Sequence, residues 1–206
     1  MKPSRITVFG TGYLGTVHAA CLAQAGFEVL GVDSDEMRLA ELSAGQPGIL
    51  EPGLEATLCR GLTSGRLSFT NSYLEAALFG DVHFLCVGAP QWTDGSTGVE
   101  RCRLEACVET LAPLLSSDDL VVGKSAVLAG TAARLAELCG PAELAWNPGY
   151  LRKGHAVPDT VAPGQIVAGV TSRRAERILR DVYTVQIAAG IPFLRTDLAT
   201  AELNQV

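Results

Sequence analysis

The chain has 206 residues, of which 48% are hydrophobic and 18% are charged, so it can bury one sizeable core, and we expect one domain with a short appendage. Its net charge of −6 and the lack of any basic run argue against nucleic acid as a partner, since phosphate binding needs clustered lysine and arginine. No segment holds about 18 unbroken apolar residues and the N-terminus leads straight into a predicted strand, so we expect no membrane span, no signal peptide and a cytoplasmic location.

The cysteines lie mostly inside predicted helices or strands and show no CxxC spacing, which argues against disulfide bonds and metal sites. We expect them to be buried as small hydrophobic side chains. They are Cys21, Cys59, Cys86, Cys102, Cys107 and Cys139.

A glycine motif follows the first apolar run, residues 5–9, and opens a helical pattern over residues 13–25. Its spacing is GxGxxG, in which Gly10 would make the tight turn, Gly12 would let backbone approach a pyrophosphate, and Gly15 would let helix pack on strand. A second apolar run, residues 28–32, ends at Asp33, about 20 positions on, where an acid binds the adenosine ribose. The pattern predicts an NAD site, because Asp33 repels a 2′-phosphate, while Arg38 leaves NADP as an alternative. The other reading is a strand, turn and helix that bind no ligand.

The rest of the chain continues the alternation of strand and helix. Helices are predicted over residues 35–44 with Ser34 as cap, 54–62, 73–79, 103–115, 131–139 and 173–185, and a last one begins with Asp197 or Thr200 as cap. Strands are predicted over residues 67–70, 82–87, 120–122, 144–146, 166–170 and 192–194, and residues 154–164 are expected to be irregular. This order predicts an α/β fold of the Rossmann type, doubly wound, with a mainly parallel sheet and helices on both faces.

Right-handed crossovers would bring Gly10, Asp33 and Gly88 to the same carboxyl edge of that sheet, where ligands bind. Residues 88–98 form a polar, turn-rich stretch after a buried strand, which makes them a candidate active-site loop. Trp92 in this loop could cover a pocket or contact another chain. Lys124 follows another buried strand and is either a pocket residue or a solvated residue at a strand end.

Taken together, seven motifs resemble the UDP-glucose 6-dehydrogenase and GDP-mannose dehydrogenase family of nucleotide-sugar oxidoreductases. They are GTGYLG at residues 10–15, GVD at 31–33, EPGL at 51–54, VGAP at 87–90, KS at 124–125 with GT at 130–131, NP at 147–148 with LR at 151–152, and AEL at 201–203. The resemblance implies an NAD-binding domain over residues 1–196 and the start of a central dimerisation helix over residues 197–206, with NAD as cofactor. It places Tyr13, Leu14, Val87, Gly88 and Ser125 beside the cofactor.

The family reaction implied by the resemblance oxidises a primary alcohol twice, through a cysteine thiohemiacetal and thioester. None of the cysteines matches the catalytic position, and several polar positions differ from the family pattern. The family motif KSTVPxGT has Ala126 for its threonine, NPEFLREG has Gly149 and Lys153 for its glutamates, and the lysine of the central helix falls on Gln205. We therefore expect a truncated homologue that binds NAD(H) without the cysteine-based double oxidation.

Three functions stay open at this point. The chain could be an oxidoreductase that needs a partner or a smaller substrate, an enzyme of non-oxidative chemistry, or a non-catalytic binding module. A small-molecule ligand is expected, in a pocket drawn from Lys124, Asn147, Arg152, Lys153 and Trp92, although Arg152 and Lys153 could instead face solvent. The oligomeric state is open, because little of the family's dimer helix lies within these residues.

Overall fold

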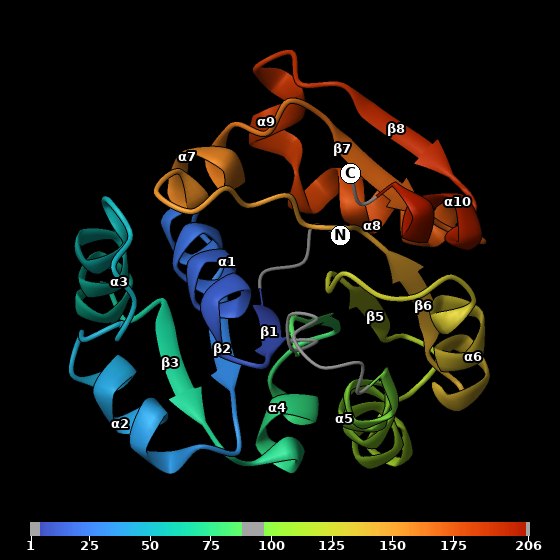
Figure 1. Ribbon diagram of the computed structural model, residues 1–206, viewed down its shortest axis with the longest axis horizontal. Coiled ribbons are helices and arrows are strands. Elements are labelled where there is room, and N and C mark those ends of the chain that lie inside the picture. The colour runs from blue at the N-terminus through green and yellow to red at the C-terminus, as the bar shows by residue number, and fades with distance from the viewer. Residues whose placement is uncertain (1–4, 88–96, 205–206) are drawn as a thin grey trace.

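The computed structural model describes residues 5–87 and 97–204, and their side chains except those of residues 97–102. Its centre is an eight-stranded sheet with the strand order β3-β2-β1-β4-β5-β6-β7-β8 (Figure 1). All neighbouring strands are parallel except β6 and β7, which pair antiparallel through Trp146 and Gly169. The strands are β1 (Arg5–Phe9), β2 (Glu28–Val32), β3 (Leu67–Thr70), β4 (Val82–Leu85), β5 (Leu120–Gly123), β6 (Glu143–Trp146), β7 (Ile166–Gly169) and β8 (Phe193–Thr196).

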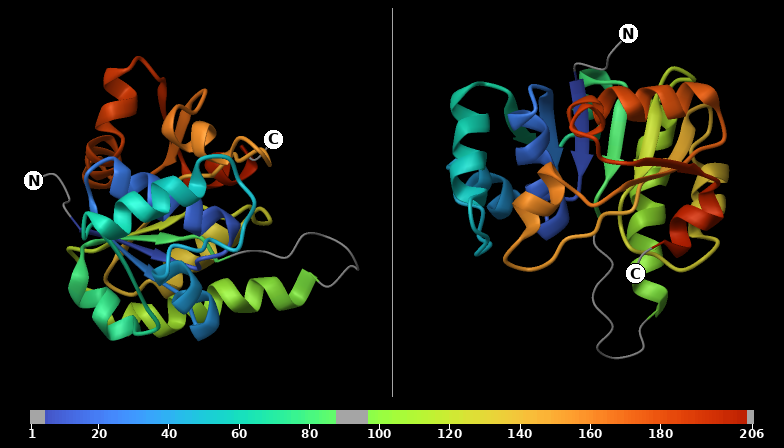
Figure 2. Two further views of the ribbon diagram at one scale, coloured as in Figure 1. Left: turned by 90° about the vertical axis from the view of Figure 1, so that its left-hand side faces the viewer. Right: turned by 90° about the horizontal axis from the view of Figure 1, so that it is seen from above.

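Helices cover both faces of the sheet, as the edge-on view shows (Figure 2). One core joins the sheet to α1, α3, α7 and α8, and a second core on the other face joins it to α4, α5, α6 and α10. The helices are α1 (Tyr13–Gln24), α2 (Glu36–Ser43), α3 (Leu54–Thr63), α4 (Tyr73–Phe79), α5 (Thr97–Leu111), α6 (Thr131–Leu138), α7 (Ala156–Val161), α8 (Arg173–Val182), α9 (Thr184–Ala188) and α10 (Leu198–Leu203), with a 3-10 turn η1 (Ala112–Leu114) after α5. The doubly wound, mainly parallel fold is confirmed.

Three local predictions were wrong. The segment expected to be irregular, residues 154–164, contains α7, whose start is bound by a carboxylate distant in sequence. The cap of α2 is Asp35 rather than Ser34, because the Asp35 carboxylate accepts a hydrogen bond from Arg38 N. The helix expected over residues 173–185 is divided at Tyr183 into α8 and α9.

The expectation that the cysteines are buried is only partly confirmed. Cys21, Cys86, Cys107 and Cys139 are buried, and burial raises the pKa of the Cys21, Cys86 and Cys139 thiols to about 12. Cys59 is exposed instead, because it lies on the outer side of α3 near Gly45, whose carbonyl its thiol approaches at 3.8 Å. The side chain of Cys102 lies outside the described part of the chain.

Candidate functional site

The turn between β1 and α1 can be formed only by glycine at its first position. Gly10 has φ +84, a left-handed conformation that side chains disfavour. A Cβ atom at Gly10 would also lie 2.7 Å from Val87 Cα, so the end of β4 packs directly against this backbone. The motif's first glycine therefore has the role that the spacing predicted for it.

The other two glycines differ in what surrounds them. A Cβ atom at Gly15 would lie 1.8 Å from Gly10 O, which shows how closely α1 packs on the turn. A Cβ atom at Gly12 would meet only Arg38 Nη1, at 3.7 Å, so this face of the turn is open. No side chain caps α1 at Gly12, and its first turn has no acidic residue. The arrangement fits an anionic ligand such as a pyrophosphate, whose charge a helix N-terminus stabilises.

Asp33 lies directly after β2 and binds the glycine turn. Its Oδ2 accepts hydrogen bonds from Thr11 N at 2.7 Å and from Thr11 Oγ1 at 2.9 Å, and its Oδ1 accepts one from Asp35 N at 3.1 Å. Arg38 on α2 forms an exposed ion pair with Asp35 at 3.8 Å. Asp33 and Arg38 thus stand at the same edge as the three glycines, as the predicted crossovers required.

Tyr13 and Glu51 connect this edge to α7. The Tyr13 hydroxyl donates to Glu51 Oε2 at 2.7 Å, and the Glu51 carboxylate also accepts from Gly154 N and Ala156 N, at 3.0 and 2.7 Å. Burial raises the pKa of Glu51, but the hydrogen bonds from Ala156, Tyr13 and Gly154 outweigh it and leave the pKa lowered. For Tyr13, burial followed by the bond to Glu51 raises the pKa to about 12. Glu51 therefore stays ionised and joins three segments of the chain.

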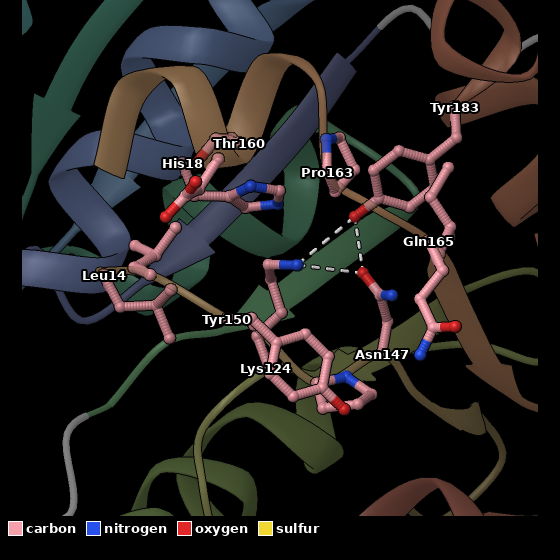
Figure 3. Close-up of a pocket in the computed structure, with 14 residues that line it drawn as sticks. Leu14, His18, Lys124, Asn147, Tyr150, Thr160, Pro163, Gln165 and Tyr183 are labelled. Carbon is pink, nitrogen blue, oxygen red and sulfur yellow. Dashed lines mark hydrogen bonds between the residues drawn. The ribbon is translucent and has the colours of Figure 1, made fainter. Parts of the chain in front are cut away.

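A second group of polar side chains surrounds a cavity of about 40 Å³ beside α1 (Figure 3). Lys124, after β5, is buried, and its Nζ donates to Asn147 Oδ1 at 2.9 Å and to the Tyr183 hydroxyl at 3.3 Å. Tyr183 also donates to Asn147 Oδ1 at 2.5 Å, and Asn147 Nδ2 donates to Val167 O. Burial lowers the pKa of Lys124 to about 8. Lys124 is thus a pocket residue and not a solvated strand end.

His18 from α1 lines the same cavity. It is 1% exposed, and both of its ring nitrogens lack a hydrogen-bond partner among the described residues. Burial, and then the charge of Lys124, lowers its pKa well below the usual value, so His18 is neutral at pH 7. Its ring packs edge-on against Phe84, with centroids 4.6 Å apart.

The remaining predicted site residues divide into three groups. Leu14 lines the cavity, and the Ser125 hydroxyl donates to Val87 O at 2.6 Å, which fixes the end of β4. Gly88 and Trp92 lie outside the described residues. Arg152 and Lys153 are exposed and do not line the cavity, and Arg152 binds Asp159 through its backbone N, Nε and Nη2.

The sequence did not reveal Glu51, His18 and Tyr183 as site residues. His18 could have been suspected, because it is an imidazole in a largely apolar stretch of α1 that is buried throughout. The roles of Glu51 and Tyr183 depend on contacts across 105 and 36 positions of the chain, which no local pattern indicates.

The chemistry of the two groups differs. The glycine turn offers open backbone, a helix N-terminus and a carboxylate, which suit a dinucleotide. The cavity offers a buried amine, a neutral imidazole and a phenol, which can donate hydrogen bonds to a small polar molecule. Within residues 5–87 and 97–204, no helix is long and apolar enough to cross a membrane.

Comparison with known proteins identifies relatives that match nearly the whole chain. Residues 4–187 match the model of the UDP-glucose/GDP-mannose dehydrogenase family, NAD binding domain. The UDP-glucose 6-dehydrogenase of Pseudomonas aeruginosa is 37% identical over 201 residues, which cover 93% of this chain and 42% of that protein.

Solved structures give the same picture. A UDP-glucose dehydrogenase from Pyrobaculum islandicum matches with a TM-score of 0.86 and 36% identity, over 97% of this chain and 48% of that one. A GDP-mannose dehydrogenase from Pseudomonas aeruginosa, solved as a ternary complex, matches with a TM-score of 0.87 and 30% identity, over the same shares. The chain spans less than half the length of these relatives.

Proposed function

Because the chain belongs to the UDP-glucose/GDP-mannose dehydrogenase family and carries its NAD binding domain, we propose that it binds NAD(H) at the carboxyl edge of the sheet. The pyrophosphate would lie over Gly12 and the start of α1, and the adenosine ribose would bind Asp33. The observation that carries this proposal is the geometry of the turn. Gly10 and Gly15 are required by backbone conformation and close packing, whereas a Cβ at Gly12 would make one ordinary contact, with Arg38, among the described residues, so that a bound ligand would give the reason for glycine there.

The same geometry supports NAD over NADP. Among the described residues Asp33 Oδ1 accepts one hydrogen bond, from Asp35 N, so it can still accept one from a ribose hydroxyl, and its charge would repel a 2′-phosphate. Arg38 lies nearby but is shared with Asp35, whose carboxylate competes with a phosphate for it.

We also propose that these residues do not perform the double oxidation of the relatives. Gly149 lines the cavity where the resemblance expects a glutamate, and a glycine cannot accept a proton. Lys153, at the second glutamate position, is exposed, and Ala126 has no hydroxyl. Gln205 lies outside the described residues.

A second function is favoured by one feature, the buried Lys124 beside a cavity. A lysine with a pKa of about 8 can exchange a proton near neutral pH, which supports acid/base chemistry on a small molecule over a purely structural module. A non-catalytic binding module could use the same cavity, but it would have no need of a lysine that exchanges a proton near neutral pH.

Two assays test this proposal on the purified chain. Isothermal titration calorimetry with NAD and NADH should give saturable heat, and absence of heat at millimolar nucleotide would refute the cofactor site. Incubation with NAD and UDP-glucose should produce no NADH above the rate without sugar. Steady NADH formation, lost in Lys124→Met, would show instead that the cavity supports the oxidation.

A further inference from the structure

The cavity beside Lys124 is lined mainly by fixed side chains and has room for about three water-sized groups. Its walls come from α1, the ends of β5 and β6, α7, and the turn after α8, which together surround the Lys124 amine (Figure 3). Leu14 of the glycine motif also lines it. The polar groups on its walls decide what it can hold.

Lys124 has no acidic partner in the described parts of the chain. An ammonium has three N–H donors, and two of them are used by Asn147 Oδ1 and the Tyr183 hydroxyl. Among the described residues Asp159 is the one carboxylate on the cavity wall, and its oxygens are bound to Arg152 at 2.7 to 3.1 Å. A buried cation without a counter-ion is costly, so the ammonium form of Lys124 needs an anion from elsewhere.

His18 also lines the cavity, and its two ring nitrogens are buried without a hydrogen-bond partner among the described residues. A neutral imidazole has one N–H donor and one acceptor nitrogen, and neither finds a partner among the described residues. Figure 3 shows the His18 ring and the Lys124 amine on neighbouring walls of one space. Buried polar groups in native proteins are nearly always satisfied, so the cavity calls for a polar occupant.

Gly149 keeps this space open. A Cβ atom at Gly149 would lie 3.0 Å from Leu14 Cδ1 and 3.6 Å from Lys124 Cε, so a side chain here would enter the cavity beside the amine. The backbone at Gly149 is not left-handed, so its conformation does not demand glycine. The space left by the missing side chain at Gly149 therefore lies next to the Lys124 amine, which has no acidic partner among the described residues.

We propose that the cavity binds a small carboxylate of the size of formate or acetate, held by the Lys124 ammonium in the space that Gly149 leaves open. Because the carboxylate pairs with the ammonium form, its affinity falls as pH rises above the Lys124 pKa of about 8. The other titratable groups around Lys124 are His18 on α1, Cys86 after β4, Tyr150 after β6, Tyr183 after α8 and Asp159 on α7.

Lysine NMR tests this directly, because the chain has only three lysines, at positions 2, 124 and 153. The protein is labelled with ¹³C at lysine Cε, and the Lys124 signal is assigned by its loss in Lys124→Met. We expect formate at millimolar concentration to raise the Lys124 titration midpoint by about one pH unit. The Lys153 signal should not move. A Lys124 midpoint that is the same with and without formate would overturn the site.

A matched pair of glycine variants provides the control. Gly149→Glu should place a carboxylate beside Lys124, so that the midpoint is already raised and formate moves it no further. Gly164→Glu adds the same charge at a position where a Cβ meets nothing within 4 Å and should respond to formate as the wild type does. Equal responses of the wild type and both variants would show that formate binds elsewhere and would also overturn the proposal.

Discussion

The carboxylate of Asp33 holds Thr11 through two hydrogen bonds to one oxygen, from the backbone N at 2.7 Å and from Oγ1 at 2.9 Å. The residue expected to bind the ribose therefore also fixes the second residue of the glycine turn. One side chain orders the turn and presents an acceptor beside it, so the proposed dinucleotide site would need little rearrangement to bind its ligand.

Separating these two roles gives the first prediction. Asp33→Ala removes the two hydrogen bonds to Thr11 and the acceptor expected to bind the ribose. We expect NAD affinity to fall on the order of 10-fold to 100-fold, the effect of losing hydrogen bonds to a charged group. Thr11→Val removes only the hydroxyl bond and should weaken NAD binding a few-fold at most, since Thr11 N still donates. Calorimetry with NAD on both variants checks this. Equal losses of NAD affinity would mean that Asp33 acts only by holding Thr11 in place and does not bind the ribose.

Glu51 should make stability depend on acid pH. Its pKa is lowered in the folded state, so it stabilises the protein above its unfolded pKa of about 4.3, and this contribution is lost as pH falls through the folded pKa. Urea denaturation should show Glu51→Gln less stable than the wild type at pH 7, with the difference narrowing as pH falls below about 4.3. Glu55→Gln, at an exposed position on α3, serves as the control. A gap of the same size at every pH would contradict the role of the charge.

Glu202 should stabilise the contact between α10 and α6. Its buried carboxylate accepts hydrogen bonds from Gly130 N, at 2.9 Å, and from Ala132 N, at the start of α6. Glu202→Gln replaces one acceptor oxygen by a donor that faces a backbone N–H. We expect a loss of about 1 to 3 kcal/mol in the free energy of unfolding, and less than about 0.5 kcal/mol for the exposed Glu137→Gln. A similar loss of unfolding free energy in both variants would show that the hydrogen bonds of Glu202 to the start of α6 contribute nothing.

His18 should make the protein less stable below neutral pH. Its folded pKa is far below the unfolded value of about 6.5, so the unfolded chain takes up a proton first as pH falls. We expect the wild type to lose up to about 2 kcal/mol between pH 7 and pH 5 relative to His18→Leu. Lys124 does not interfere, because its lowered pKa affects stability only between about pH 8 and pH 10.4.

Sequence patterns predicted the fold more completely than the site. The glycine spacing and the alternation of apolar runs fixed β1, β2 and the carboxyl edge, because close packing and strand burial leave local signals in the chain. Helix α7 was missed because its six residues include Pro158 and its start depends on Glu51, a contact across 105 positions. Lys124 could be placed at a strand end from its position after an apolar run. That the described wall of the cavity beside it has no free carboxylate could not be predicted, since that depends on Asp159 being bound by Arg152.

The most direct test of the central claim compares NAD binding to the wild type and to Gly12→Ala by calorimetry. The variant should fold normally, because Gly12 has φ −68 and, among the described residues, a Cβ there meets only Arg38 Nη1 at 3.7 Å. Alanine is a poorer N-cap than glycine, so we predict a loss of about 1 kcal/mol or less in the free energy of unfolding. We predict that NAD affinity falls about 10-fold or more, because the methyl group would occupy the pyrophosphate position. A Gly12→Ala variant that binds NAD as tightly as the wild type would contradict the account.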